Sequence, residues 1–192
     1  MHPYGGFGPI FSLDGVIPRV APDAFVAPTA AVIGDVEIGS ETGIWFHCLV
    51  RGDMNFIRIG ARTNIQDGTV IHVDSGAFST TIGDDVTVGH NAVIHGCTIK
   101  NRGFVGISAT VLDGAVIEEG GVLGAGGLLT PGKVIGPNEL WTGSPAKLRR
   151  VMDEEERKRF DRNALVYMGL ARQFRAGLRS VNPVPPEVDN HG

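Results

Sequence analysis

Aliphatic side chains recur at every sixth position along most of this chain, and this period constrains the fold more than any other feature. With short interruptions, the positions are Val20, Val26, Val32, Ile38, Ile44, Val50, Ile59, Ile65, Ile71, Ile82, Val88, Ile94, Ile99, Val105, Val111, Ile117, Leu123, Leu129, Ile135 and Trp141. A period of six matches neither the 3.6-residue period of a helix nor a long alternating strand. It is typical of a parallel β-helix, in which each hexapeptide supplies one short strand and one turn.

Three hexapeptides close one triangular coil of roughly 18 residues, with the aliphatic side chains pointing inward. The repeat therefore predicts an all-β solenoid of about seven coils over residues 20–147. Each coil buries its apolar side only by stacking on the next, so the open ends need caps. We expect residues 1–19 to cover one of these ends.

The pattern changes after residue 147, and we assign residues 148–180 to a C-terminal helical segment. Asp153 is the expected N-cap, because three glutamates follow it in the first turn, where carboxylates suit the helix dipole. The apolar residues at helical spacing are Phe160, Ala164, Tyr167, Met168, Ala171 and Leu178. Such a stripe predicts a helix packed along the side of the β-helix. Residues 181–192 are polar and rich in proline, which predicts a flexible tail.

Composition excludes several classes of protein. The 28 glycines do not fall at every third position, which excludes collagen, and 42% hydrophobic residues are too many for a disordered chain. A net charge of −4 gives no reason to expect a nucleic-acid partner. We see neither a secretory signal nor a membrane span, so we expect a cytoplasmic protein with no membrane partner. Cys48 and Cys97 lack CxxC spacing and are interpreted as buried or reduced thiols.

The repeat also assigns residues to the faces and corners of the prism. Ile59, Ile65 and Ile71 lie on faces one, two and three in turn. If residues 72–81 contain a loop that bulges from one corner, the next three aliphatic residues of the repeat lie on the same faces one coil later. We call the corner that follows face two the second corner, and the corner that follows face three the third corner.

Polar residues fall into two groups under this register. Arg51, His72 and His95 each directly follow a face-three aliphatic residue, so they stack at the third corner. Asp67 and His90 each lie two residues after a face-two aliphatic residue, so they stack at the second corner, over ~15 Å away. His90 therefore cannot share a metal with His72 and His95 of its own chain. In a threefold trimer the second corner of one prism can meet the third corner of its neighbour. Arg51 would then face Asp67 of the neighbouring subunit, and His72 with His95 would face His90 of that subunit.

Three histidines that converge under one register predict a metal site. Neutral imidazoles suit Zn²⁺ and leave a fourth position for water, while Fe²⁺ or Co²⁺ would accept the same nitrogens. A structural zinc would need a fourth ligand, for which Cys97 is the candidate. The remaining histidines, His2, His47 and His191, show no such relation and are interpreted as ordinary surface or tail residues.

The charged and amide residues near the histidines have two interpretations. Arg51, Asp53, Gln66 and Asp67 are either solvated turn residues, as charges at a β-helix corner usually are, or members of the site. For the site, Arg51 and Asp67 are placed for a charge-assisted pair across the interface. Gln66, next to Asp67, could orient a metal-bound water or a substrate.

Four segments resemble the gamma-class carbonic anhydrase family: VRGD (50–53), NIQD (64–67), VIHVD (70–74) and VGHNAVIHGC (88–97). The similarity runs over roughly residues 10–175. It implies a homotrimer of left-handed parallel β-helices, each with its C-terminal helix along the prism. The hexapeptide repeat alone would be less specific, because many acyltransferases share it.

The resemblance also implies roles for individual residues. The implied metal ligands are His72 and His95 of one subunit and His90 of the next. The implied interface ion network consists of Arg51, Asp53 and Asp67. The implied catalytic residues are Asn64 and Gln66, beside the metal-bound water, and Tyr167, which resembles a helix tyrosine that reaches towards the active site. The implied reaction is the reversible hydration of CO₂ to bicarbonate by a metal-bound hydroxide at the trimer interface.

Two positions depart from the prototype of the family. Met54 stands where the prototype has a glutamate, and the short loop Ser75–Thr81 replaces a long acidic loop that carries the glutamate proton shuttle. Proton export is therefore the step that these changes affect. Two alternatives stay open, namely a thioesterase or other hydrolase that uses the same metal site, and a catalytically weak trimeric structural module. An acyltransferase gains no support from a three-histidine site.

Overall fold

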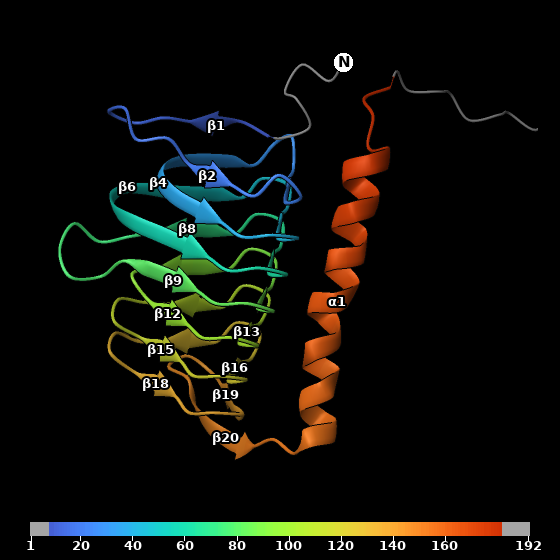
Figure 1. The fold of residues 1–192 in the computed structure, drawn as a ribbon. Helices are drawn as coiled ribbons and strands as arrows, with labels where there is room; N and C mark the ends of the chain where they lie inside the picture. Colours follow the sequence, from blue (N-terminus) through green and yellow to red (C-terminus); the bar gives the residue numbers. More distant parts are fainter. Residues whose placement is uncertain (1–7, 182–192) are drawn as a thin grey trace, which may run out of the picture.

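A computed structural model describes residues 8–181 and shows a left-handed parallel β-helix of about seven turns with one long helix beside it (Figure 1). The strands stack coil upon coil into flat faces, and every strand pair is parallel except the last. The predicted fold class is confirmed. No helix within residues 8–181 has an apolar stretch long enough to cross a membrane.

Three faces make up the prism. Face one contains β2 (Arg19–Val20), the second halves of β4 (Ala31–Ile38) and β6 (Leu49–Ile59), β9 (Thr80–Ile82), β12 (Thr98–Ile99), β15 (Val116–Ile117) and β18 (Val134–Ile135). Face two contains β3 (Phe25–Val26), β5 (Gly43–Ile44), β7 (Asn64–Ile65), β10 (Thr87–Val88), β13 (Phe104–Val105), β16 (Val122–Leu123), β19 (Glu139–Thr142) and β20 (Lys147–Val151). Face three contains β1 (Ile10–Phe11), the first halves of β4 and β6, β8 (Val70–His72), β11 (Val93–His95), β14 (Thr110–Val111) and β17 (Leu128–Leu129).

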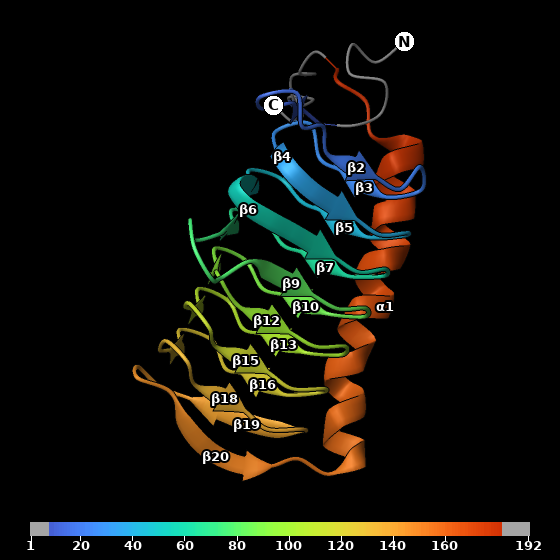
Figure 2. The same cartoon turned by 60° about the vertical axis from the view of Figure 1, so that its left-hand side comes forward.

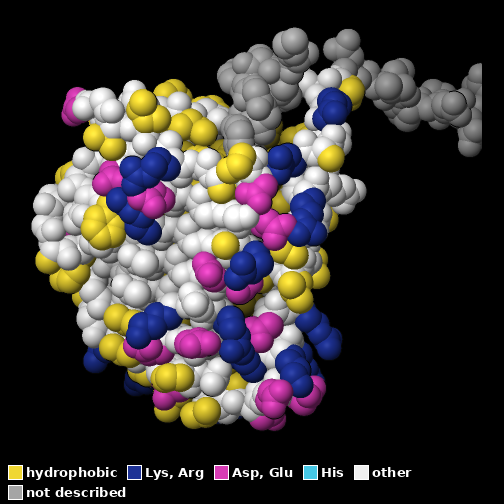
Figure 3. Space-filling model, in the orientation of Figure 1, with side chains coloured by type: hydrophobic (Ala, Val, Ile, Leu, Met, Phe, Trp, Pro, Cys, Tyr) yellow, Lys and Arg dark blue, Asp and Glu magenta, His cyan; other side chains and the backbone are white. Residues whose placement is uncertain are grey.

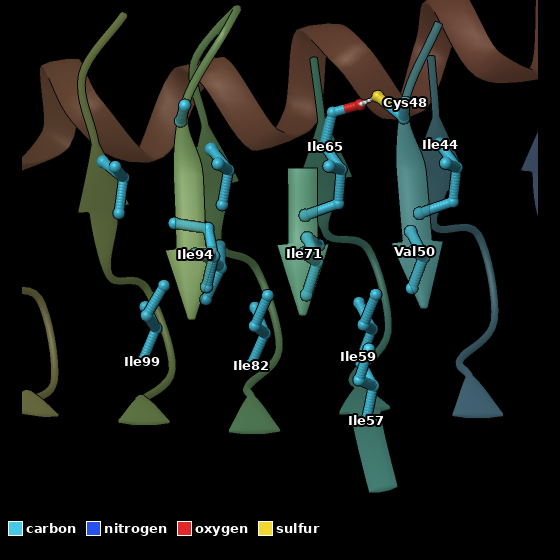
Figure 4. Packing of buried hydrophobic residues seen from close by; sticks show 14 of the residues in the cluster. Ile44, Cys48, Val50, Ile57, Ile59, Ile65, Ile71, Ile82, Ile94 and Ile99 are labelled. Atoms are coloured by element: carbon cyan, nitrogen blue, oxygen red, sulfur yellow. Dashed lines mark hydrogen bonds between the residues drawn. The ribbon is translucent and has the colours of Figure 1, made fainter. Parts of the chain in front are cut away.

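The inward row of aliphatic side chains forms the core. Ile65, Ile71 and Ile94 are fully buried, and Figure 4 shows the isoleucines of successive coils stacked along the prism axis. Cys48 lies in the same core, where its Sγ donates a 3.1 Å hydrogen bond to the carbonyl of Gln66. Cys48 and Cys97 are both buried free thiols, as the sequence predicted.

Close stacking of the coils explains why glycine so often follows the inward aliphatic residue. A Cβ added at Gly60 would lie 2.6 Å from the carbonyl carbon of Gly83 in the next coil. Ordinary side chains cannot approach a backbone so closely. Glycine at this corner therefore lets consecutive coils keep the spacing that the parallel hydrogen bonds require.

The two ends of the prism differ from the simple pattern. β1 pairs with β4 in parallel, Ile10 opposite Val32, so residues 10–20 add strands to the solenoid. Residues 1–7 of the expected cap and 182–192 of the expected tail lie outside the described residues. Residues 148–151, which we assigned to the helical segment, instead form most of β20, which pairs antiparallel with β19. The last coil would otherwise leave β19 as an unpaired edge.

The long helix α1 (Glu154–Gly177) begins at the predicted N-cap, where the Asp153 carboxylate accepts a 2.8 Å hydrogen bond from the backbone N–H of Glu156. It runs the length of the stack and packs on β3, β5 and β7 of face two (Figure 2). Phe174, which the predicted stripe omitted, holds one end, with its ring centroid 5.2 Å from that of Trp45. At the other end the buried Arg157 donates to the carbonyl of Gly120 and pairs with a helix carboxylate.

The outward rows distinguish the two faces that α1 leaves uncovered. On face one the stacked residues are Arg19, Glu37, Arg58, Thr81, Thr98, Val116 and Val134. Figure 3 shows basic and acidic side chains side by side on the view that includes this face. On face three the stacked residues are Ala31, Leu49, Val70, Val93, Thr110 and Leu128. Face three therefore presents an almost wholly apolar row without a charge.

Candidate metal centre

His72 and His95 lie directly opposite each other on face three. They are register partners in the β8–β11 pair, and His72 Nδ1 lies 3.1 Å from His95 Nε2. β8 ends at His72 and β9 begins at Thr80, so a loop leaves the prism between them. The predicted register, including the bulge within residues 72–81, is confirmed.

In both His72 and His95, the ring nitrogen that faces away from the histidine pair contacts a carboxylate. Asp53 Oδ1 lies 2.8 Å from His72 Nε2, and Asp113 Oδ1 lies 2.6 Å from His95 Nδ1. Asp53 also pairs with Arg51 of the same chain. The sequence interpretation missed Asp113, although counting one coil on from His95 would have placed it beside the third corner.

The electrostatics of Asp53 favour its ionised form. Burial of this carboxyl group works to raise its pKa, but the hydrogen bond with His72 and the charge of Arg51 outweigh burial, and the net pKa is lowered. An ionised carboxylate is a hydrogen-bond acceptor only. Asp53 therefore holds the His72 ring through the proton on Nε2.

His90 lies at the second corner in a separate cluster. Its Nδ1 is 3.0 Å from Asp67 Oδ2, and its Nε2 is 3.4 Å from the hydroxyl of Tyr167 on α1. Asp67 is fixed in turn by the backbone N–H of Phe46, at 3.2 Å. Burial, and then the charge of Asp67, raise the pKa of the Tyr167 hydroxyl. The predicted stacking of Asp67 with His90 is confirmed.

Asn64 and Gln66 lie on the outward side of face two, in the coil that carries Asp67. Both are buried, and Gln66 Nε2 donates a 3.1 Å hydrogen bond to Asn64 Oδ1. Asn64 Nδ2 donates a 2.9 Å hydrogen bond to the hydroxyl of Thr87. These fixed amides belong with the His90 cluster. The nine predicted site residues therefore divide between two corners of one chain.

Neither cluster alone offers three metal ligands. Among residues 8–181, no three His, Cys, Asp or Glu side chains converge within one chain in the way that a metal ion needs. Arg51 and Asp67 likewise have partners within the chain and do not pair with each other there. Both observations agree with the inference that His90 cannot join His72 and His95 of its own subunit.

The histidine pair nevertheless fits a metal. Two nitrogens at ~2.05 Å from a tetrahedral zinc are about 3.3 Å apart, close to the 3.1 Å between His72 Nδ1 and His95 Nε2. Cys97 does not fit the role of fourth ligand. It belongs to the apolar core, and burial raises the pKa of its thiol to about 12, which disfavours the thiolate that a metal requires.

Comparison with known proteins identifies the family. No family model matches the chain. It is 48% identical over 159 residues to gamma carbonic anhydrase 2, mitochondrial, of Arabidopsis thaliana, covering 80% of this chain and 57% of that protein. It is 41% identical over 167 residues to the carbonic anhydrase of Geobacillus kaustophilus, covering 87% of this chain and 91% of that protein. The chain belongs to the gamma carbonic anhydrase family.

A solved structure supports the same relationship. The hexapeptide transferase family protein from Anaplasma phagocytophilum superposes on this gamma carbonic anhydrase family member with a TM-score of 0.83 and 44% sequence identity, over 86% of this chain and 98% of that one. The resemblance seen in the four sequence motifs is therefore confirmed. The chain spans only 57% of the length of the Arabidopsis relative.

Proposed function

We propose that this protein hydrates CO₂ to bicarbonate, reversibly, at a metal site shared between the subunits of a homotrimer. The ligands are His72 and His95 of one subunit and His90 of its neighbour. One observation carries the proposal: a single chain presents two half-sites at two corners, each with imidazole held by carboxylate. Neither is complete alone, and a closed ring of subunits brings such unlike corners together.

The apolar row of face three supports assembly through that face. Val93 is 38% exposed, and Leu49, Val70 and Leu128 are partly exposed at stacked positions. A contiguous exposed apolar surface is typical of a protein interface. The third corner, with His72 and His95, borders this face. A neighbour docked here would therefore meet the histidine pair.

The donor set supports a divalent metal, and we propose Zn²⁺, with Fe²⁺ or Co²⁺ as alternatives. Each imidazole has one nitrogen engaged by a carboxylate, an arrangement that orients histidine ligands in metal sites. When bound, the metal supplies the Lewis acidity that lowers the pKa of water to near neutrality. His90 differs from the other two in having its second nitrogen near Tyr167.

The remaining residues have positioning roles in this proposal. Arg51 and Asp53 brace His72, and in the trimer Arg51 also reaches Asp67 of the neighbour, adding a charge-assisted contact. Gln66 and Asn64, fixed in one orientation by their mutual hydrogen bond, offer amide groups beside the reacting water and CO₂. The Tyr167 hydroxyl lies 3.4 Å from His90 Nε2, the nitrogen that faces away from Asp67, and is therefore placed beside the proposed metal ligand.

The proposal is tested by metal analysis of anaerobically purified protein, followed by stopped-flow CO₂ hydration after loading with zinc, iron or cobalt. His90→Asn should lose the metal and the activity. His47→Asn is the matched control, because His47 is exposed at the second corner two coils before His90 and its left-handed backbone (φ 61°) tolerates asparagine. Thioester hydrolysis without CO₂ hydration would favour the other hydrolase, and metal binding with neither activity would favour a structural module.

A further inference from the structure

The strongest feature outside the predicted residues is the contact between His95 and Asp113. The carboxylate lies 2.6 Å from Nδ1, on the side of the ring opposite to the nitrogen that faces His72. Asp53 is shared between His72 and Arg51, whereas no basic side chain within residues 8–181 forms a salt bridge with Asp113 other than His95. Asp113 thus serves one imidazole.

Strand register shows that this contact requires a special backbone. Ile94 pairs with Val111, so Gly96, and not His95, lies level with Asp113. The carboxylate must therefore pass over Gly96 to reach the ring. A Cβ added at Gly96 would overlap Asp113 Oδ1, and Gly96 also has a positive φ of 53° that glycine adopts without strain. Glycine at this position leaves room for the carboxylate.

The short loop contributes to the same arrangement. Phe78 packs closely over the turn. A Cβ added at Gly96 would lie 2.8 Å from Phe78 Cβ, and one added at Gly114 would lie 2.9 Å from the Phe78 ring. The loop is held by a 3.1 Å hydrogen bond from the backbone N–H of Asp74 to the Phe78 carbonyl. Asp113 is only 36% exposed beside this ring. Its contact with His95 is therefore partly shielded from water, which strengthens it.

We propose that Asp113 is a positioning residue that keeps the proton of His95 on Nδ1 and so directs the lone pair of Nε2 toward His72 and the metal. The carboxylate accepts the Nδ1–H, and this hydrogen bond selects the tautomer and the ring orientation. Gly96 is equally necessary, because the absence of a Cβ at this position lets the Asp113 carboxylate reach His95. The inference rests on the proposed function in taking Nε2 of His95 as a metal ligand.

The test compares wild type with Asp113→Asn, Asp113→Ala and Gly96→Ala in the full chain. Glu118→Gln is the matched control, since it removes a carboxylate of similar exposure that pairs with Lys100 on face one. Zinc affinity is measured by competition with a chromogenic chelator. Loss of an outer carboxylate partner typically weakens metal binding 10- to 100-fold, and we expect Asp113→Ala and Gly96→Ala to fall in that range, with Asp113→Asn affected less and Glu118→Gln unchanged.

A second readout does not need the metal. Nitrogen-15 NMR of the histidine rings in metal-free protein should show His95 as the pure Nδ1–H tautomer in wild type and as a mixture in Asp113→Ala. Circular dichroism checks that each variant is folded. Equal zinc affinity and an unchanged tautomer in Asp113→Ala would overturn the inference. Wild type that shows the tautomer but binds no zinc, iron or cobalt would refute the proposed function and leave the hydrogen-bond assignment standing.

Discussion

Faces two and three arise from the same repeat, yet their outer surfaces have different neighbours. Inside, both carry fully buried aliphatic residues, such as Ile65 on face two and Ile71 on face three. Outside, face two lies under α1, with Phe25, Trp45 and Phe174 in edge-to-face contact. Face three has the apolar row that includes Val93 and no element of the described chain packed over it.

This difference shows that the inward row of side chains forms the core, whereas the outward row determines what packs on each face. The inward row builds the prism and is nearly the same in every coil. The outward row selects what docks on each face, because only exposed side chains meet a partner. His90 lies at the edge of face two beside α1, and His72 with His95 at the edge of face three. In the proposed trimer, docking of subunits and not the core brings these two groups together.

The largest expected effect comes from splitting the half-sites between chains. His72→Ala and His90→Ala should each abolish metal binding and activity, since each removes one of three proposed ligands. After unfolding, mixing and reassembly, random assortment in a closed three-fold ring restores about one site in four. Metal content per trimer and hydration rate measure the recovery. Reassembled mixed trimers without any recovered metal would mean that all ligands come from one chain.

The next prediction tests the bare face directly. Val93→Lys would place an ammonium group in an apolar interface at three symmetry-related positions, and its desolvation costs several kcal/mol at each. We expect sedimentation of this variant to shift from trimer to monomer. Val116→Lys, at the stacked outward position of face one, is the control and should sediment as wild type. A trimer that persists in Val93→Lys would show that face three is not the docking surface.

A smaller effect is expected on the covered face. Phe174→Ala removes the half-buried ring that contacts Phe25, Trp45 and Phe46, and should lower the free energy of unfolding by about 2 kcal/mol. Leu165→Ala, on the same helix but 58% exposed, should change it by less than about 0.5 kcal/mol. Chemical denaturation followed by circular dichroism measures both. Similar losses in the two variants would argue that α1 is held by its ends and not by this cluster.

The smallest effect is kinetic and concerns proton export from the site. Met54 is 51% exposed and has no titratable group. The Asp74 carboxylate accepts a 3.3 Å hydrogen bond from the backbone N–H of Gly76 and is thus engaged within its own loop. Burial moves the pKa of Tyr167 upward, further from neutrality. Added imidazole buffer should therefore raise kcat a few-fold and leave kcat/KM nearly unchanged; a flat response in active protein would point to an internal proton carrier.

The site illustrates how far counting along the chain can go. The pairing of His72 with His95, and of Asp67 with His90, followed from the period of six because parallel strands keep a constant register. Asp113 could be placed beside the third corner in the same way, but its contact with His95 could not be predicted. Its carboxylate reaches His95 diagonally, over Gly96, and such a contact depends on the path of a turn and not on strand register.

The ends and the helix show the same limit. β20 lies where we expected the helical segment to start. The sequence did not predict this strand, because the edge of β19 with which it pairs exists only once the coils are stacked. The predicted stripe on α1 found the buried Ala164 and Ala171 but omitted Phe174, whose partners come from residues 25–46. Spacing within a helix does not reveal which aromatic residues of distant strands lie beside it.

By itself, the sequence determined the solenoid, the face of each repeat residue and the division of five site residues between two corners, with Arg51, His72 and His95 at one and Asp67 and His90 at the other. It could do so because a short period, repeated in every coil, makes local spacing equivalent to position in space. Only the tertiary structure decided which face α1 covers, which face stays bare, and that Asp53 and Asp113 hold the two histidines. These contacts join residues that are distant in sequence through turns and packed side chains, where no period applies.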